Sequence, residues 1–112
     1  MARVTSAVLA SALVRRVHQE GGSAAVLAKG DATAGGILLL TYERGSNPRF
    51  FERGLGPTGE PALIASGPAV LADEGEVAAY WQRRRSGDSD LWVIELDIAQ
   101  AERFAAETMG IH

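Results

Sequence analysis

The chain has 112 residues, a formal charge of −3 and no cysteine. Its length predicts one domain spanning residues 1–112. The lack of cysteine excludes disulfides, thiol nucleophiles and thiolate metal sites. Fourteen acidic residues against eleven basic ones argue against nucleic acid as the main partner, because binding to a phosphate backbone depends on a basic surface.

The N-terminal segment, residues 6–20, has the pattern of an amphipathic helix. Its apolar residues recur at helical spacing, and two glycines follow it as a stop. The apolar run after Arg3 imitates a signal peptide, but Arg15 and Arg16 follow it at once. The run is also shorter than the roughly 20 residues needed to span a bilayer. We therefore expect a cytoplasmic protein that does not enter a membrane.

The middle of the chain has the pattern of a β-sheet. Apolar runs at residues 24–29 and 36–42 predict two antiparallel strands joined as a hairpin by a glycine-rich loop. The second run is apolar on both faces, which is typical of a central strand. Residues 49–55 alternate and predict a third strand. Residues 54–68 are rich in glycine and proline and predict a loop, which leaves open a short edge strand at residues 62–65.

The last third of the chain predicts two further helices around a strand. Asp73 and Glu76 form a capping-box-like start to a helix that ends near Gly87. A β-forming segment follows, and residues 98–109 predict a closing helix. The order of elements predicts an α+β fold: a single antiparallel sheet of three to five strands, with about three helices packed mainly on one face.

Residues 88–97 carry the first candidate functional surface, formed by Asp88, Asp90, Trp92 and Glu95. Asp88 and Asp90 lie in a turn, and a predicted strand follows it. Trp92 lies on the core face of this strand, and the other face ends in acidic residues. The carboxylates could bind a hard cation or act as an acid–base pair. However, the spacing does not match a calcium-binding EF-hand loop.

A structural role for these carboxylates is the favoured interpretation. Asp88 and Asp90 would shape the turn, since aspartate side chains bond to nearby backbone amides. Glu95 would pair across the sheet with Arg49 or Arg53.

The second candidate surface consists of arginines and aromatics, which are enriched at protein interfaces. Its members are Arg15, Arg16, Arg49, Phe50, Phe51, Arg53, Tyr80, Trp81, Arg83, Arg84 and Arg85. Two arginine groups, at residues 15–16 and 83–85, could instead bind nucleic acid, most effectively if both lie on one side of the domain. The alternative for both groups is that they complement the dipole at a helix C-terminus.

Patterns for other chemistry are missing from the sequence. The loop at residues 30–36 has the glycines of a phosphate cradle, but a strand follows it where a P-loop needs a helix. No serine lies in a nucleophile elbow. The histidines are His18, on a predicted helix, and His112, the last residue. We therefore expect no cofactor, no metal site and no nucleophilic catalysis.

Five features occur together along the chain: Arg15-Arg16, Gly22, Lys29-Gly30-Asp31, Ala34-Gly35 and the segment from Asp88 to Glu95. In this combination the chain resembles a bacterial family catalogued as a domain of unknown function, number 1491. Residues 54–68 depart from the longer, more strand-like middle of its members. The resemblance implies a small cytoplasmic bacterial protein without an assigned activity, and it supplies no catalytic residues.

The sequence therefore favours a non-enzymatic module that binds a protein partner or a second copy of itself. The first alternative is a small metal-binding or acid–base enzyme that uses Asp88, Asp90 and Glu95. The second is a weak nucleic-acid binder that uses the arginine groups.

Overall fold

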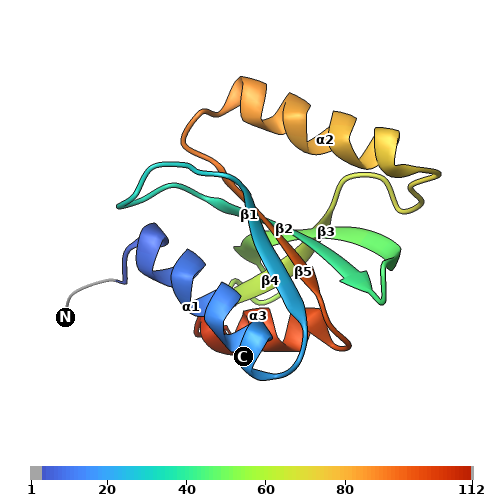
Figure 1. The fold of residues 1–112 in the computed structure, drawn as a ribbon. Coiled ribbons are helices and arrows are strands. Elements are labelled where there is room, and N and C mark those ends of the chain that lie inside the picture. The colour runs from blue at the N-terminus through green and yellow to red at the C-terminus, as the bar shows by residue number, and fades with distance from the viewer. Residues whose placement is uncertain (1–3, 112) are drawn as a thin grey trace.

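The computed structural model describes residues 4–111, which form three helices and a five-stranded sheet (Figure 1). The elements in chain order are α1 (Ser6–Gln19), β1 (Ser23–Ala28), β2 (Ile37–Glu43), β3 (Ser46–Leu55), β4 (Pro61–Ser66), α2 (Glu74–Gly87), β5 (Trp92–Asp97) and α3 (Ala101–Thr108). The α+β class and the first two helices agree with the sequence predictions. The short strand left open within residues 54–68 is present as β4. No helix within residues 4–111 is long and apolar enough to cross a bilayer.

The strands are arranged in the order β1-β5-β2-β3-β4. β2 and β5 are parallel and the other neighbours antiparallel, so the prediction of a purely antiparallel sheet is wrong. The predicted hairpin of β1 and β2 is also wrong, because β5 lies between these two strands. β5 can enter the sheet parallel to β2 because the α2 crossover carries the chain back across the sheet before β5 begins.

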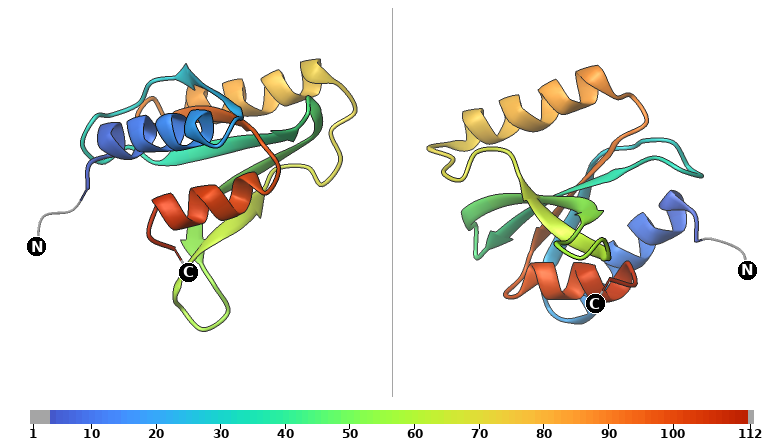
Figure 2. Two further views of the ribbon diagram at one scale, coloured as in Figure 1. Left: turned by 60° about the horizontal axis from the view of Figure 1, so that its bottom comes forward. Right: turned by 180° about the vertical axis from the view of Figure 1, so that it is seen from behind.

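The helices form two layers, one on each face of the sheet (Figures 1 and 2). α1 and α3 lie together on one face, as expected for most of the helices, whereas α2 packs alone on the other. The core is divided accordingly. One apolar cluster joins α1 and α3 to residues such as Leu39 and Ile94. A second cluster joins Val77 of α2 to residues such as Leu38 and Val93.

β5 is buried on both faces. Trp92, Ile94 and Leu96 belong to the cluster beneath α1 and α3, and Leu91 and Val93 to the cluster beneath α2. The sequence placed the core on only one face of this strand. The face toward α2 is also core as far as Val93, and its acidic part begins only at Glu95.

α3 begins three residues later than predicted. The amide of Ile98 still donates to the carbonyl of Tyr42 (3.2 Å), which extends the contact between β5 and β2 past the end of the strand. The chain then turns at Gln100, whose φ of 59° lies in the left-handed region. The helix starts at the next residue, and its buried residues are Ala101 and Ala105.

Candidate functional site

The glycine-rich loop at residues 30–36 is fastened to the start of β5. The amide of Asp31 donates to the carbonyl of Asp90 (3.0 Å), and the indole N–H of Trp92 donates to the carbonyl of Asp31 (2.8 Å). A Cβ atom on Gly30 would lie 2.0 Å from the backbone carbonyl oxygen of Asp90, and one on Gly35 would lie 2.1 Å from the same atom. These glycines therefore allow a close backbone approach to β5 rather than forming a cradle for phosphate.

The same loop also caps α1. The amides of Ser6 and Ala7 donate to the carbonyls of Thr33 and Ala32 at 3.2 and 2.9 Å. The Ser6 hydroxyl donates to the carbonyl of Gly35 (2.6 Å). The first amides of a helix have no partners within the helix, so these bonds anchor the start of α1. The loop thus joins α1 to β5.

Asp88 and Asp90 lie on an exposed turn before β5. The Asp88 carboxylate accepts from the amide of Asp90 (3.1 Å), and the Asp88 carbonyl accepts from the amide of Leu91 (3.2 Å). The Asp88 side chain thus shapes the turn by bonding a nearby backbone amide, as its structural interpretation predicts. Glu95 lies five positions after Asp90, roughly 17 Å away at about 3.3 Å per residue of strand. The three candidate carboxylates therefore do not converge on one point.

A metal site is not formed by the candidate carboxylates. Within residues 4–111 no three His, Asp or Glu side chains lie close enough together to hold a metal ion.

Glu95 is half-buried on the face covered by α2. Burial raises the pKa of its carboxyl, and the nearby charges of Asp97 and Glu74 raise it further. The predicted pairing of Glu95 with Arg49 or Arg53 is wrong. Arg49 lies on the opposite face of the sheet, where it contacts Glu102 of α3.

Tyr42 lies near Glu95 on the neighbouring strand β2. Burial raises the pKa of its hydroxyl, and Glu95, Glu74 and Asp97 raise it further. The surrounding carboxylates and burial therefore favour the protonated forms of Tyr42 and Glu95.

Two of the three arginines at residues 83–85 bond within the domain. Arg84 donates two hydrogen bonds to the carboxylate of Glu52 (2.6 and 2.9 Å) and one to the hydroxyl of Tyr80 (2.9 Å). The hydrogen bonds from Arg84 to the carboxylate lower the pKa of Glu52. Arg85 donates to the carbonyl of Ser89. Arg84 and Arg85 thus attach the last turn of α2 to the rest of the domain.

The two arginine groups lie on opposite faces of the sheet. Arg16, on α1, bonds to Glu107 of α3 (2.7 Å) and its guanidinium lies 5.0 Å from the centre of the Phe104 ring. Arg15 is exposed on the same helix. The two arginine groups therefore do not lie on one side of the domain, which was the arrangement that would have favoured nucleic-acid binding.

The expected aromatic surface is mostly internal. Phe50 and Phe51 are 1% and 9% exposed, so the expectation that they contribute to an interface is wrong. They alternate on β3 and point into the two apolar clusters, one on each face. Tyr80 and Trp81 are half-buried and pack against the cluster beneath α2.

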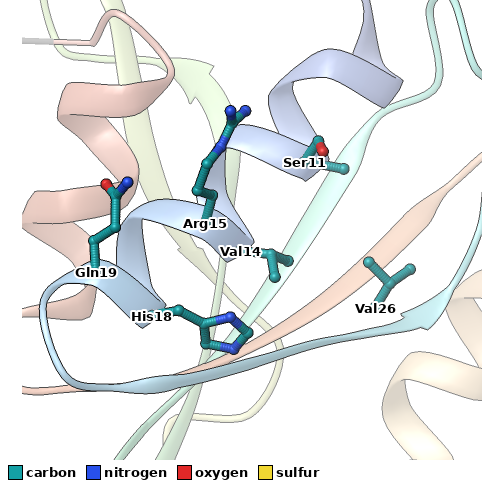
Figure 3. A pocket seen from close by; sticks show the side chains of 7 residues that line it. Ser11, Val14, Arg15, His18, Gln19 and Val26 are labelled. Atoms are coloured by element: carbon teal, nitrogen blue, oxygen red, sulfur yellow. The ribbon is translucent and has the colours of Figure 1, made fainter.

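A groove lies between the outer side of α1 and the edge strand β1 (Figure 3). It has a volume of about 690 Å³. Val14 and Val26 give it apolar walls, and Val26 is 40% exposed. The side chains labelled along the groove are Ser11, Val14, Arg15, His18, Gln19 and Val26.

Sequence reasoning missed this groove, although Arg15 was a candidate residue. Its other members have ordinary residue types at ordinary spacing. The available signal was the composition of residues 23–28, which contain no charge and no proline. A strand of that kind is unprotected if it lies at a sheet edge.

His18 makes a contact that the sequence did not indicate. Its Nε2 accepts a hydrogen bond from the amide of Ala24 on β1 (3.3 Å). The side chain thereby bridges the last turn of α1 and the outer side of β1. His112 lies outside the described residues.

A second, more polar hollow of about 640 Å³ lies beside Asp97. The carboxylate of Asp97 accepts from the amides of Arg44 and Gly45 at 2.8 and 2.9 Å. Both residues have positive φ, 52° and 74°. Asp97 thus stabilises the tight turn between β2 and β3.

Comparison with protein families gives one match that spans nearly the whole chain. The model described as "Protein of unknown function (DUF1491)" matches residues 4–106. The chain belongs to the DUF1491 family. The resemblance inferred from the sequence motifs is therefore confirmed. In this DUF1491 chain, Gly30, Gly35, Asp90 and Trp92 from those motifs meet where the loop joins β5.

Solved DUF1491 structures share the fold. The chain is similar to the crystal structure of a DUF1491 family protein from Caulobacter crescentus CB15, with a TM-score of 0.76 and 29% identity over 91% of this chain and 94% of that one. An NMR structure of a DUF1491 family protein from the same organism gives 0.76 and 28% over 93% and 94%. Protein Atu0922 from A. tumefaciens gives 0.69 and 31% over 88% and 89%. No curated protein matches the chain.

Proposed function

We propose that this DUF1491 chain is a non-enzymatic protein-interaction module. The observation that carries the proposal is the groove beside an open sheet edge. β1 pairs with β5 on one side only, and α1, on the adjacent face of the sheet, forms a wall of the groove beside it. Proteins usually protect such edges, because unpaired backbone groups and exposed apolar side chains there are available to another chain.

The surface around the groove supports the same function. Val8, about one turn before Ser11 on α1, adds an exposed apolar side chain, since it is 56% exposed. Arg15 adds a charge at the other end of the groove. An apolar area with an arginine at its border has the composition of many protein interfaces.

A photo-crosslinking amino acid at Ser11 tests the proposal in cells that encode the chain. We expect a discrete crosslinked product between the chain and one partner, which mass spectrometry would identify and purified proteins would confirm by direct binding. The same crosslinker at Thr58, on the exposed turn between β3 and β4, is the matched control. Formation of only uncrosslinked chain at both positions would contradict the proposed function.

A further inference from the structure

We propose that the first turn of α2, residues 74–77, is a pH-sensitive latch that unwinds from the sheet when the carboxyl of Glu95 loses its proton. The inference is independent of the groove beside β1, because α2 lies on the opposite face of the sheet from α1 (Figures 1 and 2). An open latch would expose part of the apolar cluster to which Val77 belongs.

The two ends of α2 are attached to the domain differently. At the C-terminal end, Arg84 donates two hydrogen bonds to Glu52 of β3 (2.6 and 2.9 Å), and residues 88–91 lead directly into the inner strand β5. The N-terminal end follows residues 67–73, a mostly exposed connection from the edge strand β4 in which Val70 is 81% exposed. The N-terminal end is therefore the end that can move.

The first turn of α2 has few contacts that hold it on the sheet. Val77 is the one residue of α2 that is buried, and Leu71, just before the helix, is half-buried in the same cluster. The polar bonds of this turn are local. Asp73 accepts from the amide of Glu76 (2.9 Å), and Glu76 accepts from the amide of Ala72 (2.8 Å). These bonds start the helix but do not reach the sheet.

The groups that face Glu95 are either acidic or uncharged. Its neighbours in the sheet register are Ala25 of β1 and Leu40 of β2. The charges that act on its carboxyl are those of Asp97, two residues later on β5, and of Glu74 in the latch. Closure of the latch therefore brings a carboxylate of α2 toward two carboxylates of the sheet.

Tyr42 of β2 belongs to the same group, because burial and these three carboxylates raise the pKa of its hydroxyl. Arg44 follows two residues later, but its side chain is exposed, and its contact with Asp97 is made by the backbone amide (2.8 Å). Among residues 4–111, no ion pair joins a cation to any of the three carboxylates. Their mutual repulsion is therefore not offset by a paired cation.

Ionisation of Glu95 works against the closed latch. In the closed form, burial and then the charges of Asp97 and Glu74 raise the pKa of Glu95 above 4.5. In the open form this carboxyl gains water and Glu74 recedes, so its pKa returns toward 4.5. The open fraction therefore rises as pH increases from 4.5 through the raised pKa and then stays constant. The pKa of Glu52 is lowered, so Glu52 stays ionised in this range and keeps its bond to Arg84.

A single cysteine measures the opening, because the chain has no cysteine of its own. In Val77→Cys the thiol lies beneath α2 and reacts with 4,4′-dithiodipyridine when the latch is open. Val17→Cys makes the same change in α1, where the side chain is 0% exposed, and is the matched control. Each labelling rate is divided by that of the same variant unfolded in urea at the same pH. We expect faster normalised labelling of Val77→Cys.

The pH dependence identifies the group that controls the latch. From pH 5 to pH 8 the normalised rate of Val77→Cys should rise about two- to fivefold, the size of a charge interaction near the surface. Adding Glu95→Gln should abolish the rise, and adding Glu74→Gln should reduce it. Glu76→Gln removes a charge from the same turn, but its side chain bonds to Ala72, so the rise should remain.

Hydrogen exchange of the wild-type chain gives a second measurement that needs no substitution, in case Val77→Cys does not fold. The amides of residues 78–80 bond to the carbonyls of residues 74–76 within the helix. After correction for the intrinsic exchange rate, their protection should fall from pH 5 to pH 8. The amides of residues 84–87, at the attached end, should keep theirs.

Three results would overturn the inference. Equal normalised labelling of Val77→Cys and Val17→Cys would show that α2 opens only when the whole domain unfolds. A normalised rate that does not change with pH would show that Glu95 does not act on the latch. A rise that persists in Glu95→Gln would assign the pH dependence to another group. Each result leaves the proposed function intact, since crosslinking at Ser11 reports the other face.

Discussion

α1 and α3 contact the sheet through a continuous apolar layer, whereas α2 contacts the other face through one buried valine and several long amphipathic side chains. Leu13 and Val17 of α1 and Ala105 of α3 are at most 1% exposed. In α2 only Val77 is buried, and Tyr80 and Trp81 are half-buried. One face therefore depends on close packing, and the other depends more on polar contacts at its border.

This difference separates the part of the fold that should be rigid from the part that should open first. Regions with few buried apolar contacts unfold locally at lower free energy than the rest of a domain. α2 has that character, because its main polar link to the sheet is the bond between Arg84 and Glu52. The groove beside β1 belongs to the more closely packed face, which favours a preformed binding site.

Removal of core volume should have the largest effect, and it should differ between the two faces. Leu13→Ala leaves a cavity beneath α1, and we expect the free energy of unfolding to fall by about 3 kcal/mol. Val77→Ala removes two methyl groups beneath α2 and should cost about 1.5 kcal/mol. Urea denaturation followed by circular dichroism measures both. Equal losses per carbon atom removed would mean that α2 is packed as closely as α1.

Removal of the Glu52 charge should have an intermediate effect. In Glu52→Gln the bonded Arg84 loses its anion, which should lower the free energy of unfolding at pH 7 by about 1 kcal/mol for a partly buried pair. The folded state lowers the pKa of Glu52 below its ordinary 4.5. The unfolded chain therefore binds the proton first, and the stabilisation is lost as pH falls below 4.5 through the lowered pKa.

Urea denaturation at several pH values measures this loss, and the difference between wild type and Glu52→Gln should shrink with acid. Glu107→Gln provides a matched control on the other face, because Glu107 bonds to Arg16 at an exposed position. It should change stability little. If Glu52→Gln lowered the free energy of unfolding equally at pH 7 and pH 3, the charge of Glu52 would not be what stabilises its contact with Arg84.

Glu95→Gln should have the smallest effect, and its sign should be opposite. The folded state raises the pKa of Glu95 above 4.5, so folding favours the protonated form. Stability contributed by this residue is therefore lost as pH rises from 4.5 through the raised pKa. We expect Glu95→Gln to be more stable than wild type at pH 7, by less than about 1 kcal/mol, and equal to it in acid.

The same denaturation series measures this gain. A variant less stable than wild type at pH 7 would show that the ionised carboxylate has a favourable partner. Glu95 would then regain its place as a candidate functional residue.

Local patterns in the sequence were sufficient for most elements. The periodicity of residues 6–20 and the cap at Asp73 identified α1 and α2, because both signals depend on neighbours within a few residues. The amide of Glu76 donates to the Asp73 carboxylate (2.9 Å), as the cap predicts. The Asp88 turn was also identified, since its bonds are local.

Features that depend on distant partners were not predictable in this way. β5 lies between β1 and β2, although both strands are far from it in the sequence. The glycines in the loop between β1 and β2 instead resembled the signal of a hairpin. Glu95 and Arg49 were wrongly assigned to the same face of the sheet. Alternation shows which residues of one strand share a face, but it does not show which face of a second strand lies on the same side. The groove beside β1 depended on which strand became the edge, and that followed from the position of β5.

The position of β5 also has a consequence for biosynthesis. β1 emerges from the ribosome before the other strands, yet its sheet neighbour is complete only when Asp97 has been made. Until then β2, β3 and β4 can pair with one another, while both sides of β1 lack a partner. Pairings between such distant segments form slowly, and unpaired strands are open to aggregation. The nascent chain therefore exposes the same strand that the finished domain leaves half-paired, and β1 stays unpaired until β5 has been translated.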